Sequence, residues 1–216
     1  MILSRDELLK ESPELAAQAC IRPLSSPGAQ DAQIAELNSG MLIMAAAPVF
    51  GDDGQVLAVL YGGKLLNNNN AIVDKARDII FQNERYKDKD VGAVTIFQND
   101  LRIATSIRTT SGERAIGTLV SPRVYQNVLV GGDIFNKVEF AVNDWYITAY
   151  EPIKDISGNI IGILGLSPQG KRRTAITSRS SLPIPAAAFQ RSTWSSYSSR
   201  SLPLKKWAGE RGWALL

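Results

Sequence analysis

The residues best suited to bind a small molecule lie together in one polar and aromatic segment, residues 144–150. If this segment is a β-strand, its side chains alternate between two faces, so Asp144, Tyr146 and Tyr150 share one face and Trp145 lies on the other. A carboxylate beside two phenols can bind an amine or another polar small molecule, and aromatic rings attract a cation by roughly 0.5–2 kcal/mol. The alternative is that one face packs on a helix and the other meets solvent. These four residues are therefore candidate ligand-binding residues.

Two arginines and a threonine extend this set of candidate ligand-binding residues. Arg102 offers a planar guanidinium suited to a ligand carboxylate. It lies three positions from Thr105 on a predicted strand, so the two side chains share a site only if a bulge intervenes or one acts through its backbone. Arg114 lies in a loop between Gly112 and Gly117. The alternatives to ligand binding are that Arg102 points into solvent from its strand and that Arg114 only stabilises its loop through hydrogen bonds.

The composition restricts the catalytic chemistry that the chain could perform. Histidine is absent from the 216 residues, and Cys20 is the single cysteine. Histidine is the commonest metal ligand and general base near neutral pH, so His-based nucleophile pairs, His-ligated metals and a phosphorylatable histidine are excluded. One cysteine forms neither an intramolecular disulfide nor a four-cysteine zinc site. The sequence therefore predicts no catalytic residue, no metal and no cofactor, and an enzyme that uses Asp144 and a tyrosine is the remaining catalytic alternative.

The net charge of +3 conceals two segments of opposite charge. Residues 1–166 hold 15 Lys/Arg and 20 Asp/Glu, whereas residues 167–216 hold nine Lys/Arg and one acid. The basic pI therefore belongs to the C-terminal segment, and it does not indicate a nucleic-acid partner for the folded part. This segment also holds ten serines and shows no hydrophobic periodicity, so we expect it to be disordered.

The pattern of apolar residues predicts an α+β fold. Ser4 and Ser12 are expected to cap two short helices, and apolar runs around turn residues predict hairpins. Helical spacing predicts one amphipathic helix over residues 71–86 and a short helix that begins at Ser121-Pro122 and runs through Leu129. The predicted strands are 41–50, 56–60, 91–97, 101–107, 134–142, 144–153 and 158–166.

An internal repeat relates two of the predicted hairpins. Residues 41–63 align without a gap on residues 145–167, at an offset of 104 positions. Pro48 matches Pro152 and Gly54 matches Gly158, and aliphatic residues match around them. This agreement favours duplication of one structural unit, although two hairpins of similar composition would give a weaker version of the same pattern.

With these residues in view, the sequence resembles the Cache superfamily, specifically the double-Cache sensor regions of bacterial receptor histidine kinases and chemoreceptors. The resemblance depends on five segments that together span about 40–167, because each segment alone is weak. These are residues 40–50, 60–66, 93–105, 112–118 and 142–153.

The resemblance implies PAS-like antiparallel sheet modules, each with a long helix along its sheet. It divides the chain into a partial membrane-distal module at 1–66, a membrane-proximal module with its leading helix at 67–167, and a Ser/Arg-rich tail at 168–216. The family's first transmembrane helix and its long distal helix have no counterpart in residues 1–66. A reading frame shifted across the second membrane span would explain the tail.

The resemblance also implies a function, which is small-molecule sensing outside the cytoplasm for a membrane-bound receptor. Expected ligands are amino acids, carboxylates or amines, bound between the sheet and the loops and short helices that cover it. No apolar run is long enough for a transmembrane helix, and no signal peptide is recognisable. A homodimer is one possible assembly. The alternative function is a cytoplasmic PAS-like or profilin-like interaction module that binds no ligand.

Overall fold

The computed structural model describes residues 1–24, 35–86, 89–141, 144–168 and 214–215. The chain forms two compact units. The first unit comprises residues 1–44, 63–170 and 216, and the second comprises residues 45–62 and 171–215. The expectation of disorder for the tail concerns residues that lie outside the described part, apart from the short strand β11 (Ala214–Leu215).

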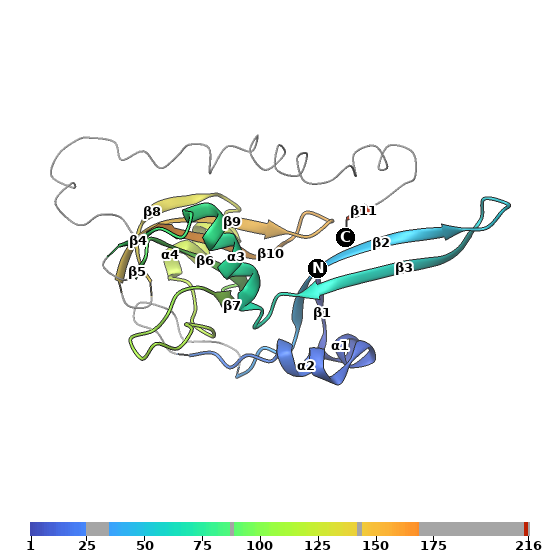
Figure 1. Ribbon diagram of the computed structural model, residues 1–216, viewed down its shortest axis with the longest axis horizontal. Helices are drawn as coiled ribbons and strands as arrows, with labels where there is room; N and C mark the ends of the chain where they lie inside the picture. Colours follow the sequence, from blue (N-terminus) through green and yellow to red (C-terminus); the bar gives the residue numbers. More distant parts are fainter. Residues whose placement is uncertain (25–34, 87–88, 142–143, 169–213, 216) are drawn as a thin grey trace. The chain divides into compact units, whose positions relative to one another are not determined.

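An antiparallel sheet of five strands forms the centre of the first unit, in the order β7-β6-β10-β9-β8 (Figure 1). The prediction that residues 91–107 and 134–166 form one antiparallel sheet is therefore confirmed. β10 lies in the middle and pairs with β6 on one side and β9 on the other. The strands are β6 (Gly92–Gln98), β7 (Leu101–Thr105), β8 (Phe135–Ala141), β9 (Asp144–Lys154) and β10 (Ile160–Pro168).

One face of this sheet is covered by helix α3 (Asn70–Phe81) (Figure 1). Val73 of the helix is buried among Val94 and Ile96 of β6, which point to the same face because they lie two residues apart. The sequence predicted a helix over residues 71–86, and this prediction was wrong about the C-terminal end of the helix. The helix stops at Phe81 because Gln82 and Asn83 adopt left-handed backbone angles, and a small ribbon follows. The ribbon consists of β4 (Arg85–Tyr86) and β5 (Lys89–Asp90).

The opposite face is covered by a short irregular helix. Ser121 caps α4 (Pro122–Val124) by accepting a hydrogen bond from the Val124 amide. The helix then widens into the π-helical turn η1 (Tyr125–Val130), whose end is marked by a bond from the Gly131 N–H to the Gln126 carbonyl. Val124 and Val128 of this helix are buried in a second cluster with Val120 and with four residues of the sheet, namely Phe97, Phe135, Tyr150 and Ile163.

The predicted first hairpin is also present, as β2 (Gly40–Phe50) and β3 (Val56–Leu65). Its turn has the same hydrogen bonds as the turn between β9 and β10. The Gly51 N–H donates to the Gln55 carbonyl and the Gly54 N–H to the Gly51 carbonyl, and the Asp155 and Gly158 N–H groups make the corresponding bonds 104 positions later. Gly54 and Gly158 both have positive φ, which glycine adopts without strain. The turns support the repeat that the sequence indicates.

Two short helices precede this hairpin, as the sequence predicts. Ser4 caps α1 (Arg5–Glu11) in a capping box with Glu7, and Ser12 caps α2 (Pro13–Ala19). The strand β1 (Ile2–Leu3) pairs with β2 at Gly40 and Met41. Apolar residues of both helices form one buried cluster with the base of the hairpin, namely Leu8, Ala16, Ala19, Leu42 and Leu65.

The side chain of Asn67 joins these parts of the first unit. It is fully buried, and its Oδ1 accepts a hydrogen bond from the Met41 N–H at 2.8 Å. Its Nδ2 donates to the carbonyls of Ala19 (3.0 Å) and Ser39 (3.1 Å) and to Oε1 of Gln98 (3.4 Å). One carboxamide therefore links α2, the start of β2 and the end of β6.

We expect Asn67→Ala to lower the free energy of unfolding by about 3 kcal/mol, because each buried partner left without a hydrogen bond costs about 1–3 kcal/mol. Asn69→Ala is the matched control, since the Asn69 side chain makes one bond, to the Leu65 carbonyl. Urea denaturation of the full chain should show a loss of about 1 kcal/mol for the control. Equal losses for the two variants would contradict the special role of Asn67.

Candidate functional site

A bulge in β7 places two of the predicted site residues on one face. Thr105 pairs with Thr95 and Arg102 pairs with Phe97, while the register shifts between them and leaves Ile103 without a partner. Thr95 and Phe97 lie two residues apart on β6 and share a face, so their partners Thr105 and Arg102 share it as well. The structure thus contains the bulge that the sequence argument required for these two residues to act together.

Arg102 lies against aromatic rings on this face. Its side chain is almost fully buried, with 3% of its surface exposed, and its guanidinium carbon lies 5.0 Å from the centre of the Phe97 ring. The Phe97 and Tyr150 rings meet edge to face at 6.1 Å, and the Phe135 ring lies 6.3 Å from that of Tyr150. We call the set Phe97, Arg102, Phe135 and Tyr150 the aromatic face.

Gly165 makes room for this arrangement. A Cβ atom at position 165 would lie 2.8 Å from the ring of Tyr150, which is closer than real Cβ contacts allow. The Tyr150 ring therefore crosses the central strand β10 at a residue without a side chain and reaches the ring of Phe97 on β6. The glycine in this strand has a packing role that composition alone does not indicate.

Two further cations lie over the ring of Phe135. The guanidinium of Arg123, from α4, is 5.5 Å from the ring centre, and the ammonium of Lys137, from β8, is 5.7 Å away. Both are exposed, in contrast to the buried Arg102. The aromatic face therefore holds one cationic side chain, Arg102, and two more border it, which favours a ligand with negative charge.

Thr105 and Thr148 have their hydroxyl groups engaged within the protein. The Thr105 hydroxyl pairs with that of Thr95 at 2.7 Å and accepts a hydrogen bond from the Ile107 N–H. The Thr148 hydroxyl donates to the Lys137 carbonyl at 2.9 Å. Thr105 and Thr148 are both buried, and these bonds fix strand β7 and the pairing of β8 with β9.

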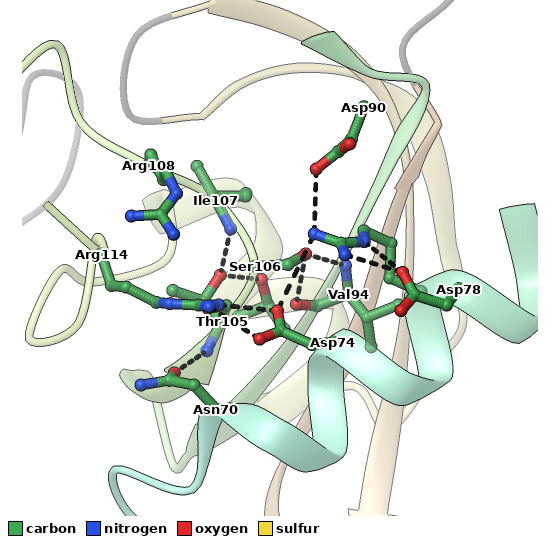
Figure 2. A network of polar contacts seen from close by, with 12 residues as sticks. Asn70, Asp74, Asp78, Asp90, Val94, Thr105, Ser106, Ile107, Arg108 and Arg114 are labelled. Carbon is green, nitrogen blue, oxygen red and sulfur yellow. Dashed lines mark hydrogen bonds and ion pairs between the residues drawn. The ribbon is translucent and has the colours of Figure 1, made fainter. Parts of the chain in front are cut away.

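Arg114 lies in a different environment from Arg102. Its guanidinium binds both carboxylate oxygens of Asp74 on α3, at 2.8 and 2.7 Å, and also the Thr105 carbonyl at 2.7 Å (Figure 2). Asn70 of the same helix accepts a hydrogen bond from the Thr105 N–H. The structure thus brings Arg114 to the helix α3, and we call the pair Arg114–Asp74 the clamp.

The clamp continues along α3 through a second arginine. The guanidinium of Arg77 lies 3.8 Å from the carboxylate of Asp74, 2.7 Å from that of Asp78 and 2.9 Å from that of Asp90 in β5. Both arginines are about one-fifth exposed, so solvent screens these pairs only in part. The network fastens α3 to the loop after β7 and to the small ribbon.

The remaining predicted site residues lie at the start of β9. Asp144 pairs with Ala141 and Tyr146 with Glu139, and Trp145 lies between them in the strand. The side chains of Asp144, Trp145 and Tyr146 lie outside the described residues, so their part in a site stays a prediction. Tyr150, four residues along the strand from Tyr146, is buried in the aromatic face.

Phe97, Phe135 and Gly165 were missed as site residues by the sequence reasoning. Alternation along residues 92–98 could have placed Phe97 beside Thr95, but a single sequence does not show which strand neighbours it. Asp74 was missed as the partner of Arg114, because 40 residues separate the two.

Cys20 and Asp100, both outside the aromatic face, have raised pKa values. Hydrogen bonding to Glu36 raises the pKa of the Cys20 thiol, and burial raises it further. The thiolate is therefore disfavoured, and Cys20 is poorly suited to act as a nucleophile. Burial also raises the pKa of Asp100, in the turn between β6 and β7.

We expect the clamp to contribute measurably to stability. A double-mutant cycle with Arg114→Ala and Asp74→Ala should give a coupling energy of about 1–2 kcal/mol, because the pair is bidentate and mostly shielded. The control pair is Arg22–Glu36, whose arginine side chain is 84% exposed and whose coupling should fall below about 0.5 kcal/mol. Chemical denaturation provides the free energies. Coupling no larger than in the control would show that the clamp is a solvent-screened surface pair.

Within the described residues, no helix has the length and apolar character needed to cross a membrane.

Comparisons with known proteins identify one family. No curated protein matches the chain. The model of the family described as single cache domain 3 matches residues 64–176, just over half of the 216 residues. These residues include α3, the five-stranded sheet and the short helix that covers its other face. The chain therefore belongs to the Cache superfamily of sensor domains.

Proposed function

We propose that this chain is the extracytoplasmic small-molecule sensing module of a transmembrane signal-transduction receptor, either a sensor histidine kinase or a methyl-accepting chemoreceptor. Cache domains are sensor domains that typically lie outside the cytoplasm, and they are not catalytic. In such a receptor any enzymatic output would belong to other domains. The periplasmic location and the membrane-bound parent are parts of the same proposal, as is the assignment of residues 1–66 to a partial membrane-distal module.

The proposed ligand site is the aromatic face beneath α4 and η1. The observation that carries it is the guanidinium of Arg102, buried against Phe97 at 5.0 Å beside Tyr150. The planar guanidinium of Arg102 lies beside the aromatic rings, and such a group binds a carboxylate through two parallel charge-assisted hydrogen bonds. Arg123 and Lys137 add positive charge at the edge. These features favour a carboxylate as the group that is bound.

The other predicted residues would complete the site in different ways. From alternation along the sequence we expect Asp144 and Tyr146 to share the face of Tyr150, where the carboxylate of Asp144 would bind the ammonium group of an amino acid or an amine. Trp145 would lie on the other face of the strand. Thr105 and Arg114 would act as positioning residues, because both are bonded to protein groups beside β7. An amino acid is therefore the favoured ligand, with other organic acids and amines as further candidates.

Ligand binding would act on the covering helix and the central strand. The π-helical turn η1 has a bond pattern that is less regular than that of an α-helix, and Gly131 and Gly132 follow it. Ile163 and Gly165 of β10 lie at the aromatic face, and β10 leads directly to residues beyond 168. A ligand that binds one arrangement of η1 more tightly than another would shift the population, and β10 would transmit the change.

A thermal-shift screen of the full chain against amino acids, organic acids and polyamines tests this proposal. We expect at least one carboxylate-bearing compound to raise the Tm. Arg102→Lys keeps the charge but loses the planar fork, so the affinity for that compound should fall about ten- to a hundredfold, which corresponds to about 1.5–3 kcal/mol.

Arg108→Lys is the matched control, because Arg108 is exposed and donates to the Gly112 carbonyl. It should leave the ligand-induced shift unchanged. If no compound in the three classes raises the Tm, or if both variants reduce the shift equally, the aromatic face is not the ligand site.

A further inference from the structure

The register of β7 decides on which face of the sheet Arg102 lies. Thr105, at one end of the strand, pairs with Thr95, and an uninterrupted antiparallel ladder from this pair would place Arg102 opposite Gln98. Arg102 pairs with Phe97 instead, because the bulge shifts the register by one residue. A shift of one residue moves a side chain to the opposite face, so without the bulge Arg102 would point away from the aromatic face.

A bulge in an outer strand needs hydrogen bonds from outside the sheet. β7 is the outermost of the five strands, so β6 pairs with it on one side. A bulge leaves its extra residue unpaired in the ladder, and buried backbone groups rarely lack a hydrogen bond. Two segments of the chain supply these bonds along the outer side of β7, one before the bulge and one from the bulge onward.

The backbone of residues 117–118 bonds to the part of β7 before the bulge. The Gly117 N–H donates to the Arg102 carbonyl, and the Arg102 N–H donates to the Thr118 carbonyl, both at 2.9 Å. These two bonds fix the main chain at Arg102, and they join backbone atoms.

The start of α3 bonds to the rest of β7. The Asn68 N–H donates to the carbonyl of Ile103, the extra residue of the bulge, at 2.8 Å. The Asn70 Oδ1 accepts a hydrogen bond from the Thr105 N–H at 3.1 Å, and Arg114 donates to the Thr105 carbonyl at 2.7 Å (Figure 2). The bulge and the pair at Thr105 are therefore fixed from α3, and Asn70 contributes through its side chain.

We propose that Asn70 is a positioning residue for Arg102, because its carboxamide oxygen maintains the register of β7 beyond the bulge. The inference rests on the proposed function in treating Arg102 as a ligand-binding residue. Without this oxygen the Thr105 N–H loses its acceptor in α3, and the register that lacks the bulge becomes more populated. Arg102 then spends part of the time away from the aromatic face.

Reaction of the unliganded full chain with phenylglyoxal tests this directly, because the reagent modifies the arginine guanidinium groups that it can reach. Arg102 is 3% exposed, so it should react slowly in the wild type. In Asn70→Ala its rate should rise about two- to tenfold, since one neutral hydrogen bond changes an equilibrium by about that factor. Mass spectrometry of peptides distinguishes Arg102 from Arg5, an exposed residue of α1 that serves as the reference.

Two further variants control for a general loss of structure. Asn70→Asp keeps an acceptor oxygen at the same position, so Arg102 should react at the wild-type rate. Asn69→Ala also removes one hydrogen bond of a half-buried carboxamide at the start of α3, but that bond goes to the Leu65 carbonyl. It should lower the Tm about as much as Asn70→Ala and leave the rate at Arg102 unchanged.

Three results would overturn the proposal. The first is an unchanged rate at Arg102 in Asn70→Ala. The second is an equally fast reaction in Asn70→Asp, which would show that the acceptor oxygen has no part in the effect. The third is the same rise in Asn69→Ala, which would indicate a general loosening of α3. Because the reaction uses the unliganded chain, a ligand screen without a hit leaves this result standing, and the two proposals fail separately.

Discussion

The carboxamide of Asn67 is the constraint on which the arrangement of the first unit depends. An amide buried without partners would cost several kcal/mol, so its surroundings must supply a hydrogen bond for each of its polar atoms. They do so only if α2, the start of β2 and Gln98 of β6 meet at one place. Because Gln98 immediately precedes the turn into β7, the same contact lies beside the strand that carries Arg102.

The two faces of the five-stranded sheet differ in what covers them. Helix α3 packs its apolar residues on β6, and the clamp and Arg77 fasten its polar side to neighbouring loops. The other face carries a short helix with π-helical geometry above aromatic rings and a buried guanidinium. Natural proteins accept local departures from ideal packing where they bind ligands. The proposed site lies on the face with such departures.

Much of the fold was predictable from sequence because its signals are local. Ser4, Ser12 and Ser121 cap helices where expected, and glycines at turns mark the hairpins. The predicted end of α3 was wrong, because Gln82 and Asn83 adopt left-handed backbone angles and stop the helix at Phe81.

The candidate site was less predictable, because its key contacts join distant residues. The pairing of Arg114 with Asp74 connects positions 40 residues apart. Arg102 faces Phe97 only because Ile103 forms a bulge, and a bulge depends on how two strands align rather than on one residue type. The chemistry of their side chains made Arg102 and Tyr150 candidates, but the sequence did not show that they share a face.

We propose that ligands bind beneath the short helix, on the face of the sheet away from α3. Hydrogen–deuterium exchange of the full chain, with and without the compound that raises the Tm most, tests this directly because it resolves protection by segment. Binding on this face should slow exchange in residues 121–131 and in β9, with little change in α3. Protection confined to α3 and the loop at 107–115, or none in either place, would contradict it.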